Sequence, residues 1–155
     1  MKKSKILNNL TIPLVSLSFL LSVVSFDLIS KALVAANLPL GESKTIVPYL
    51  LEFSHIKNKG AAYGSFSQNR VFLIIITLLG LLTLLVAQSY FIYKKNKIMA
   101  TFILPMLTGG ALGNAVERIF LPEGVTDFIV FPFIQGKLAF NCNVADIFIS
   151  IGFFS

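Results

Sequence analysis

Charge is scarce in this chain of 155 residues: Asp, Glu, Lys and Arg together make up 13% of it, against 55% hydrophobic residues. A soluble domain carries about 25% charged residues, so this chain has too few to cover a surface that faces water. Its mean hydropathy of +0.83 points the same way. We therefore predict an α-helical integral membrane protein that forms a single domain over residues 1–155.

Cysteine and histidine are almost absent as well. Cys142 is the only cysteine, which excludes an internal disulfide and a multi-cysteine metal site, and we expect it to be a small packing residue. His55 is the only histidine, which excludes a histidine-rich zinc site, and we expect it to face solvent from a strand. No G-x-S-x-G turn offers a serine nucleophile. The sequence thus predicts no metal and no other cofactor.

Four apolar stretches predict four transmembrane helices, at about residues 8–30, 71–93, 98–117 and 139–155. At a rise of 1.5 Å per residue the second is about 34 Å long, enough to cross a bilayer, while the last is slightly short at about 25 Å. The first apolar run is longer than the core of a secretory signal, so we expect it to be retained as a span.

Lysine clusters flank these apolar runs and predict the topology. They comprise Lys2, Lys3, Lys5, Lys94, Lys95 and Lys97, within a net charge of +6. Because cytoplasmic loops carry the excess of lysine, the N-terminus is predicted in the cytoplasm and segments 31–70 and 119–138 outside it. Residues 49–56 read as a strand, which indicates a small extracytoplasmic β-structure. Clusters of this kind are membrane anchors and do not indicate a nucleic-acid partner.

The unusual polar residues gather at the predicted outer ends of the spans. Asp127 is expected in an outer loop, and Asn143 and Asp146 about two turns into the fourth span. Polar residues in or beside spans are costly and therefore candidates for function. The full set is Asp27, Lys31, Asn58, Asn114, Glu117, Arg118, Asp127, Asn143 and Asp146. Their common depth predicts a single site.

Asp127 and Asp146 come from different segments and can meet in this layer. Two carboxyls that share one proton can act together as general base and general acid, and so hydrolyse a peptide bond without a metal. The alternative is structural: each aspartate caps a helix or pairs with Arg118 or Lys31. Spacing alone leaves both interpretations open.

Other patterns also allow two interpretations. Asp27 and Lys31, four residues apart, can form an interfacial ion pair without a role in chemistry. The glycines at 109, 110 and 113 predict close helix packing, which would also narrow the site. The phenylalanine-rich segment 128–133 suits anchoring at the membrane interface or the floor of a groove for an acyl chain.

Two further functions compete with hydrolysis. A small transporter or channel subunit would use Asp27, Asp127 and Asp146 for ions or protons, but a conduction path needs polar steps across the whole membrane, and the inner halves of the spans are apolar. An assembly subunit without chemistry gives no reason for two separated aspartates at one depth. A different intramembrane aspartyl protease would need a G-x-G-D block, which is absent.

Five blocks in order carry a resemblance to a known family. They are D-L-I-S-K at 27–31, N-K-G-A-A-Y-G at 58–64, G-G-A-L-G-N-A-V-E-R at 109–118, V-T-D-F-I at 125–129 and N-V-A-D at 143–146. Over residues 21–152 the chain resembles lipoprotein signal peptidase, the type II signal peptidase of bacteria. Two positions depart from that family's pattern: Glu117 stands where the family has Asp, and Cys142 where it has Phe.

The resemblance implies an aspartyl endopeptidase of the bacterial cytoplasmic (inner) membrane. Its substrates would be prolipoproteins whose cysteine carries diacylglycerol, cut just before that cysteine. The resemblance also implies a bundle of four helices with an extracytoplasmic β-cradle, membrane lipids around it, and inhibition by globomycin. We expect a monomer.

The same resemblance assigns roles to residues of this chain. Asp127 and Asp146 would be the catalytic pair. Asn58, Gly60, Asn114, Arg118 and Asn143 would line the site and orient the substrate or the pair, and Asp27 and Lys31 would support it.

Overall fold

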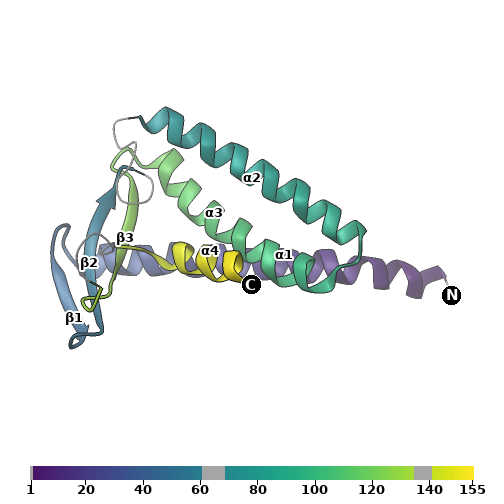
Figure 1. The fold of residues 1–155 in the computed structure, drawn as a ribbon, viewed down its shortest axis with the longest axis horizontal. Helices are drawn as coiled ribbons and strands as arrows, with labels where there is room; N and C mark the ends of the chain where they lie inside the picture. The colour runs from purple at the N-terminus through teal and green to yellow at the C-terminus, as the bar shows by residue number, and fades with distance from the viewer. Residues whose placement is uncertain (1, 61–68, 135–140) are drawn as a thin grey trace.

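The computed structural model describes residues 2–60, 69–134 and 141–155, with side chains from residue 10 onward. Four helices and a small sheet make up the fold (Figure 1). The helices are α1 (Lys2–Asn37), α2 (Arg70–Tyr93), α3 (Leu104–Phe120), which follows a π-helix at Met99–Ile103, and α4 (Val144–Phe154). The sheet lies at one end of the helices, and the turn from α2 to the π-helix lies at the other (Figure 1).

Three helices are long and apolar enough to cross a membrane: Leu10–Asn37, Arg70–Tyr93 and Met99–Phe120. α1 and α2 turn large apolar side chains outward, such as Leu17 and Leu82, as helices surrounded by lipid do. The prediction of a membrane protein with apolar helices and a small β-structure is thereby confirmed.

Two helices begin or end at other residues than the predicted spans do. α1 continues beyond residue 30 to Asn37, so Lys31 lies inside the helix and not in an outer segment. The fourth helix begins at Val144 and not at 139, because Asn143 caps it in an extended conformation. Its 11 residues extend about 16 Å. Residues 139 and 140 of the predicted span lie outside the described residues.

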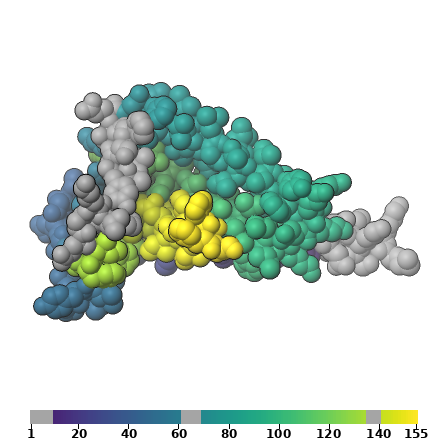
Figure 2. Space-filling model, viewed as in Figure 1, coloured from purple at the N-terminus to yellow at the C-terminus, as the bar shows by residue number. Residues whose placement is uncertain are grey.

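α3 is the central helix and packs against α1, α2 and α4. Its glycines allow this close approach: a Cβ on Gly110 would lie 2.7 Å from the carbonyl oxygen of Ala145 on α4, and one on Gly109 would lie 2.8 Å from Val23 on α1. The predicted close packing at these glycines is confirmed. α4 lies at the front of the bundle in the view of Figure 2.

The sheet is antiparallel, in the order β1 (Ser43–Val47), β2 (Leu51–Asn58) and β3 (Val125–Val130). The strand expected at 49–56 is β2, displaced by two residues. β3 was expected to be a loop, which is wrong. Its pairing with β2 sets Asp127 opposite Ile56 and Asn58 opposite Val125, so two distant segments of the chain meet here.

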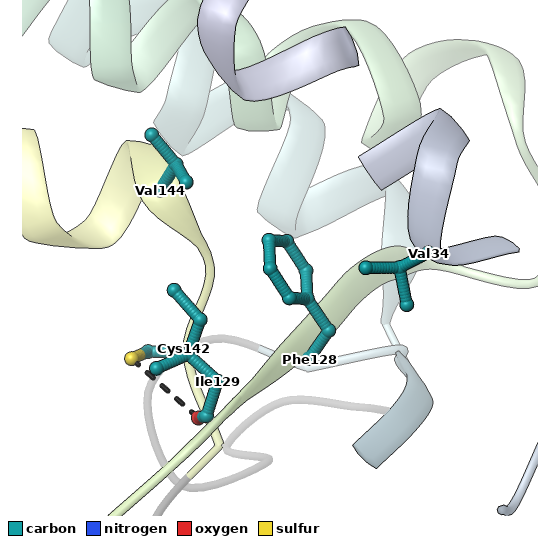
Figure 3. Packing of buried hydrophobic residues seen from close by; sticks show 5 residues of the cluster. All are labelled: Val34, Phe128, Ile129, Cys142 and Val144. Carbon is teal, nitrogen blue, oxygen red and sulfur yellow. Dashed lines mark hydrogen bonds between the residues drawn. The ribbon is translucent and has the colours of Figure 1, made fainter. Parts of the chain in front are cut away.

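A small apolar core joins β3 to the chain that enters α4. Its members are Val34, Phe128, Ile129, Cys142 and Val144 (Figure 3). Cys142 and Ile129 exchange two backbone hydrogen bonds, of 2.8 and 3.0 Å, and the Cys142 thiol lies 3.7 Å from the Ile129 carbonyl. Cys142 is thus the packing residue that was expected. Phe128 is also buried, so the expected interface anchoring is wrong for this residue.

Two polar residues lie where the sequence did not predict them. His55 was expected to face solvent but is 6% exposed, because the chain after α1 folds over it and its Nδ1 lies 2.8 Å from the Leu38 carbonyl oxygen. Gln88, near the far end of α2, donates at 2.6 Å to both the Ser16 hydroxyl and the Ala100 carbonyl. The prediction that every unusual polar residue shares one layer is therefore wrong for Gln88.

Candidate active site

Asp127 is the third residue of β3 and is 4% exposed. One of its oxygens accepts a hydrogen bond from Asn58 Nδ2 at 2.9 Å and the other from Asn143 Nδ2 at 2.8 Å. Asn58 lies two residues beyond Ile56, the direct partner of Asp127, and therefore on the same face of the sheet. The Gly60 N–H donates to Asn58 Oδ1 at 2.9 Å, which turns the amide nitrogen of Asn58 toward Asp127.

Asp146 lies in the first turn of α4, and not two turns into the helix as expected. Its Oδ2 accepts from the backbone N–H of Asn143 at 3.1 Å, while Asn143 Oδ1 accepts from the backbone N–H of Asp146 at 3.0 Å. This reciprocal pair is a capping box, so the helix-capping alternative holds for Asp146. Its other oxygen accepts from Asn114 Nδ2 at 2.8 Å.

Asn143 joins the two aspartates. It is fully buried, donates to Asp127 and shares the capping box with Asp146. Its Nδ2 also lies 3.0 Å from Asn114 Oδ1. The structure therefore brings Asp127 and Asp146 to one site, with Asn143 and Asn114 between them.

Burial raises the pKa of Asp127 to about 6, from an ordinary value of 3.8. The hydrogen bonds donated by the side-chain amides of Asn58 and Asn143 lower this pKa, and the nearby charge of Asp146 raises it further. A carboxyl with this pKa exchanges a proton near neutral pH, which is what general acid or base catalysis requires.

A buried ion pair lies behind the aspartates. Lys31 Nζ donates to Asp27 Oδ2 at 2.7 Å and to Asn114 Oδ1 at 2.8 Å, and Asp27 Oδ1 accepts from the Ala145 N–H at 2.8 Å. The two side chains are 2% and 0% exposed, so the expected ion pair is present, although it is buried and not interfacial. It fixes Asn114 and the first turn of α4. A Cβ on Gly113 would clash with Asp27.

Arg118 contacts other partners than the aspartates. Its guanidinium donates to the Gly60 carbonyl and to the Thr77 hydroxyl, both at 3.2 Å. In the described part of the chain, the ion pairs to carboxylates go to Asp27 and Glu117, so the alternative in which Asp127 or Asp146 pairs with Arg118 or Lys31 does not hold. Arg118 and Gly60 instead hold the chain that follows Asn58. Residues 61–64 of that sequence block lie outside the described residues.

Sequence reasoning missed a second buried cluster beside the site. Glu117, which was predicted in the layer of polar residues but given no role, accepts from Thr126 twice, at 2.8 Å from its N–H and 2.6 Å from its hydroxyl. Its carboxylate also pairs with Lys31 at 3.5 Å and with Lys57 at 3.6 Å. Lys57 and Thr126 had no signal of their own beyond lying next to Asn58 and Asp127. The cluster thus holds Thr126, the residue of β3 directly before Asp127, in place.

Metal ligation finds no support among the residues described: no three His, Cys, Asp or Glu side chains in ranges 2–60, 69–134 and 141–155 are grouped to hold an ion. What the site offers is a pair of carboxyls oriented by three asparagine amides. One carboxyl is buried with a raised pKa, and the other is partly exposed at a helix start.

Comparisons with known proteins show which family this chain resembles. The model of the family described as signal peptidase (SPase) II matches residues 19–155. A lipoprotein signal peptidase of Lactococcus lactis is 37% identical over 145 residues, covering 90% of this chain and 89% of the relative. One of Clostridium tetani is 33% identical over 130 residues, covering 83% and 81%.

Solved structures with the same fold include a bacterial membrane enzyme determined by the in meso method at 2.3 Å resolution. It superimposes with a TM-score of 0.76 at 33% sequence identity and covers 90% of this chain and 82% of that one. A second, determined at 1.9 Å resolution, gives a TM-score of 0.74 at 32% identity and covers 90% and 87%.

Proposed function

This chain belongs to the signal peptidase II family, and we propose that Asp127 and Asp146 are its two catalytic aspartates. As a member of that family it is a membrane peptidase that cleaves the signal peptides of prolipoproteins. The observation that carries the catalytic assignment is the position of Asn143. Its amide binds Asp127 while its backbone and side chain bind Asp146, so one residue holds both carboxyls at one site.

The two carboxyls divide the chemistry between them. One, ionised, takes a proton from the attacking water, while the other, protonated, donates to the carbonyl oxygen and later to the leaving amine. Each such proton transfer contributes roughly 10²–10⁴-fold to the rate. The raised pKa of Asp127, about 6, supports a pair that holds one proton between its members near neutral pH.

Neighbouring residues act by positioning this pair. Asn58, Asn114 and Asn143 orient the carboxyls through their amides. The Asp27 and Lys31 ion pair supports Asn114 and the start of α4. Gly60 and Arg118 hold the segment that carries Asn58.

The substrate in this proposal is a prolipoprotein with diacylglyceryl on its cysteine, cut just before that cysteine. The exposed apolar surfaces of α1 and α2 support an enzyme surrounded by lipid, in which the signal peptide and the acyl chains stay in the membrane. The scissile bond reaches the carboxyls at the sheet end of the helices. Globomycin would block the site.

Placement in the membrane follows from the lysines. The turn at 94–97, rich in lysine, lies at the end of the bundle opposite the sheet (Figure 1). By the positive-inside rule that end faces the cytoplasm, as does the N-terminus. The site then opens on the extracytoplasmic face of the bacterial cytoplasmic membrane, in a single domain of residues 1–155 that acts as a monomer.

The decisive experiment is a cleavage assay in detergent micelles with a lipobox peptide, either diacylglyceryl-modified on its cysteine or unmodified. Asp127→Asn and Asp146→Asn should each lower cleavage of the modified peptide at least about 10³-fold, because each removes one proton transfer and disturbs the other. Glu123→Gln, at an exposed turn before β3, is the matched control and should cleave normally. Globomycin should inhibit the wild type.

Thermal melting checks that each variant is folded. A folded Asp127→Asn or Asp146→Asn protein with near-normal cleavage would refute the role of that aspartate. Equal cleavage of the unmodified peptide would refute the lipid requirement and leave the aspartate assignment standing.

A further inference from the structure

A groove lies at the end of the bundle farthest from the sheet, between α1, the end of α2 and the π-helix. Its volume is about 890 Å³. Ligand sites in proteins measure about 300–1,000 Å³, so the groove has the size of a binding site. α2 begins beside the active site, where Arg70 donates to the Ile119 carbonyl at 2.9 Å, and ends at the groove. Its 24 residues separate the two sites by about 36 Å.

The wall and the rim of the groove differ in chemistry. Ile12, Val15, Ile92 and Phe102 form an apolar wall, and Lys95 and Lys97 contribute two ammonium groups. None of the described residues that line the groove is acidic. An apolar wall beside two positive charges is complementary to a molecule with a hydrocarbon chain and an anionic head.

The turn that carries the lysines is held in one shape. Lys95 has a φ of 56°, in the left-handed region where helix ends favour glycine. The Asn96 N–H donates to the Phe91 carbonyl at 3.1 Å, and Asn96 Oδ1 accepts from the Met99 N–H at 3.2 Å. Lys95 thus occupies a position where glycine would relax the backbone, in a turn that hydrogen bonds fix on both sides, so its side chain starts from a fixed point beside the groove.

We propose that this groove binds one anionic phospholipid, with its phosphate at Lys95 and Lys97 and an acyl chain along the apolar wall. A lipid fits better than a soluble anion because the wall belongs to helices that lie in the membrane, where hydrocarbon is the surrounding solvent. The bound lipid would fasten α1 to the junction of α2 and the π-helix. This binding does not depend on the proposed catalytic pair.

The chain offers a matched control next to the site. Lys94 lies in the same turn, but it does not line the groove, and its ammonium lies 5.6 Å from the centre of the Tyr90 ring. Removing the charge of Lys94 changes the net charge of this end as much as removing that of Lys95. The two changes therefore differ in their effect on lipid binding only if the lipid binds in the groove.

Native mass spectrometry of the full chain in detergent tests the proposal, with phosphatidylglycerol and phosphatidylcholine of identical acyl chains as probes. The wild type should prefer phosphatidylglycerol. Lys95→Gln and Lys97→Gln should each lower its affinity about fivefold and the double variant roughly 30-fold, because a basic group near the surface contributes about that much to binding an anionic lipid. Lys94→Gln should bind as the wild type does.

A second variant tests the apolar wall. Val15 is 43% exposed, so Val15→Trp should fold, keep both lysines and still lose phosphatidylglycerol by filling the groove. Equal binding of the two lipids by the wild type would overturn the proposal. An equal loss of phosphatidylglycerol affinity in Lys94→Gln would overturn it as well. So would full competition by glycerol phosphate, which has no acyl chains. A groove that binds a second copy of the chain, seen as a dimer in the mass spectrum in place of a lipid adduct, would also overturn it.

Discussion

The two ends of the helix bundle bury the same functional group for different purposes. At the sheet end the amide of Asn143 binds the carboxyl of Asp127 and caps α4 with Asp146. At the far end the amide of Gln88 joins the Ser16 hydroxyl to the Ala100 carbonyl. Both side chains are at most 9% exposed. A buried amide thus orients ionisable groups in one region and only links helices in the other.

The difference lies in how completely each amide is bonded. Asn143 Nδ2 has acceptors in Asp127, Asn114 and Thr126, and its Oδ1 accepts from Asp146. Among the described residues, Gln88 Oε1 has no hydrogen-bond partner. A polar network whose members are all satisfied is rigid, and a rigid network is what positioning requires. The sheet end should therefore be sensitive to any change and the far end tolerant.

Among the changes that test this comparison of the two buried amides, the largest effect on cleavage is expected from Asn143→Ser. Serine still caps α4 but is too short to reach Asp127, so the pair loses its connection while the helix start keeps its cap. Activity on the lipidated peptide should fall on the order of 100-fold, as expected for misplaced catalytic groups. Stability should also fall, by about 1–3 kcal/mol, because the change keeps the cap but leaves buried oxygens of Asp127 and Asn114 without the donor that Asn143 supplies. Steady-state kinetics and thermal melting measure the two effects.

Asn69→Ser is the matched control, because Asn69 caps α2 by accepting from the Phe72 N–H at 3.0 Å and is an asparagine N-cap like Asn143. It should leave cleavage within about twofold of the wild type. Equal losses in the two variants would mean that Asn143 acts only as a helix cap.

A large loss of stability is expected from Lys31→Met. The change leaves Asp27 buried without its cation, and breaking a buried ion pair on one side costs about 3–5 kcal/mol. Adding Asp27→Asn to Lys31→Met removes the second charge and should restore most of that stability. Reversible unfolding in mixed micelles measures the stability of the wild type, of Lys31→Met and of the double variant. Failure of the double variant to recover would show that Lys31 acts mainly through Asn114 and Glu117.

How far the sequence predicts this molecule differs between its elements. Helix existence follows from long apolar runs, which is why α1, α2 and α3 were found. β3 was missed because it is buried on both faces and so lacks alternation. The start of α4 was readable in principle, since Asn143 followed three residues later by Asp146 is a capping signal. An apolar run upstream of Asn143 hid it.

The candidate site shows the same division. The sequence motifs named the residues that gather around Asp127 and Asp146. They could not give the contact between Lys57 and Thr126, 2.8 Å long, because it depends on the register of two strands 69 residues apart. The burial of His55 likewise depends on how the chain after α1 folds over β2. Contacts of this kind have no local signal.

A smaller effect, which only the sheet end should show, is a dependence of stability on pH through Asp127. Its pKa in the folded protein, about 6, lies above the ordinary 3.8, so the folded state binds the proton more tightly than the unfolded state. The free energy of unfolding should therefore fall as pH rises from about 4 to about 6, and stay lower above that.

Asp127→Asn removes this dependence. Relative to the wild type it should gain on the order of 1–3 kcal/mol between pH 4 and pH 7.5. A constant offset is also expected, because an amide at 127 meets the amide donors of Asn58 and Asn143, but that offset does not vary with pH. Melting curves at the two pH values separate the two contributions. If the stability difference between the wild type and Asp127→Asn is the same at pH 4 and pH 7.5, the pKa of Asp127 lies near its ordinary value.

The smallest effect is expected from Gln88→Leu at the far end. The change removes two hydrogen bonds of 2.6 Å but also an oxygen that has no partner, and leucine suits a helix in lipid. Hydrogen bonds between membrane helices contribute about 0.6 kcal/mol each on average, so losing two costs about 1.2 kcal/mol, and removing the unpartnered oxygen offsets part of this. The net loss should be about 1 kcal/mol or less at every pH, with cleavage unchanged. Unfolding and peptide cleavage in the same micelles measure both. A loss of several kcal/mol would mean that the far end is as tightly determined as the sheet end, and that an incompletely bonded amide is no guide to tolerance in this bundle.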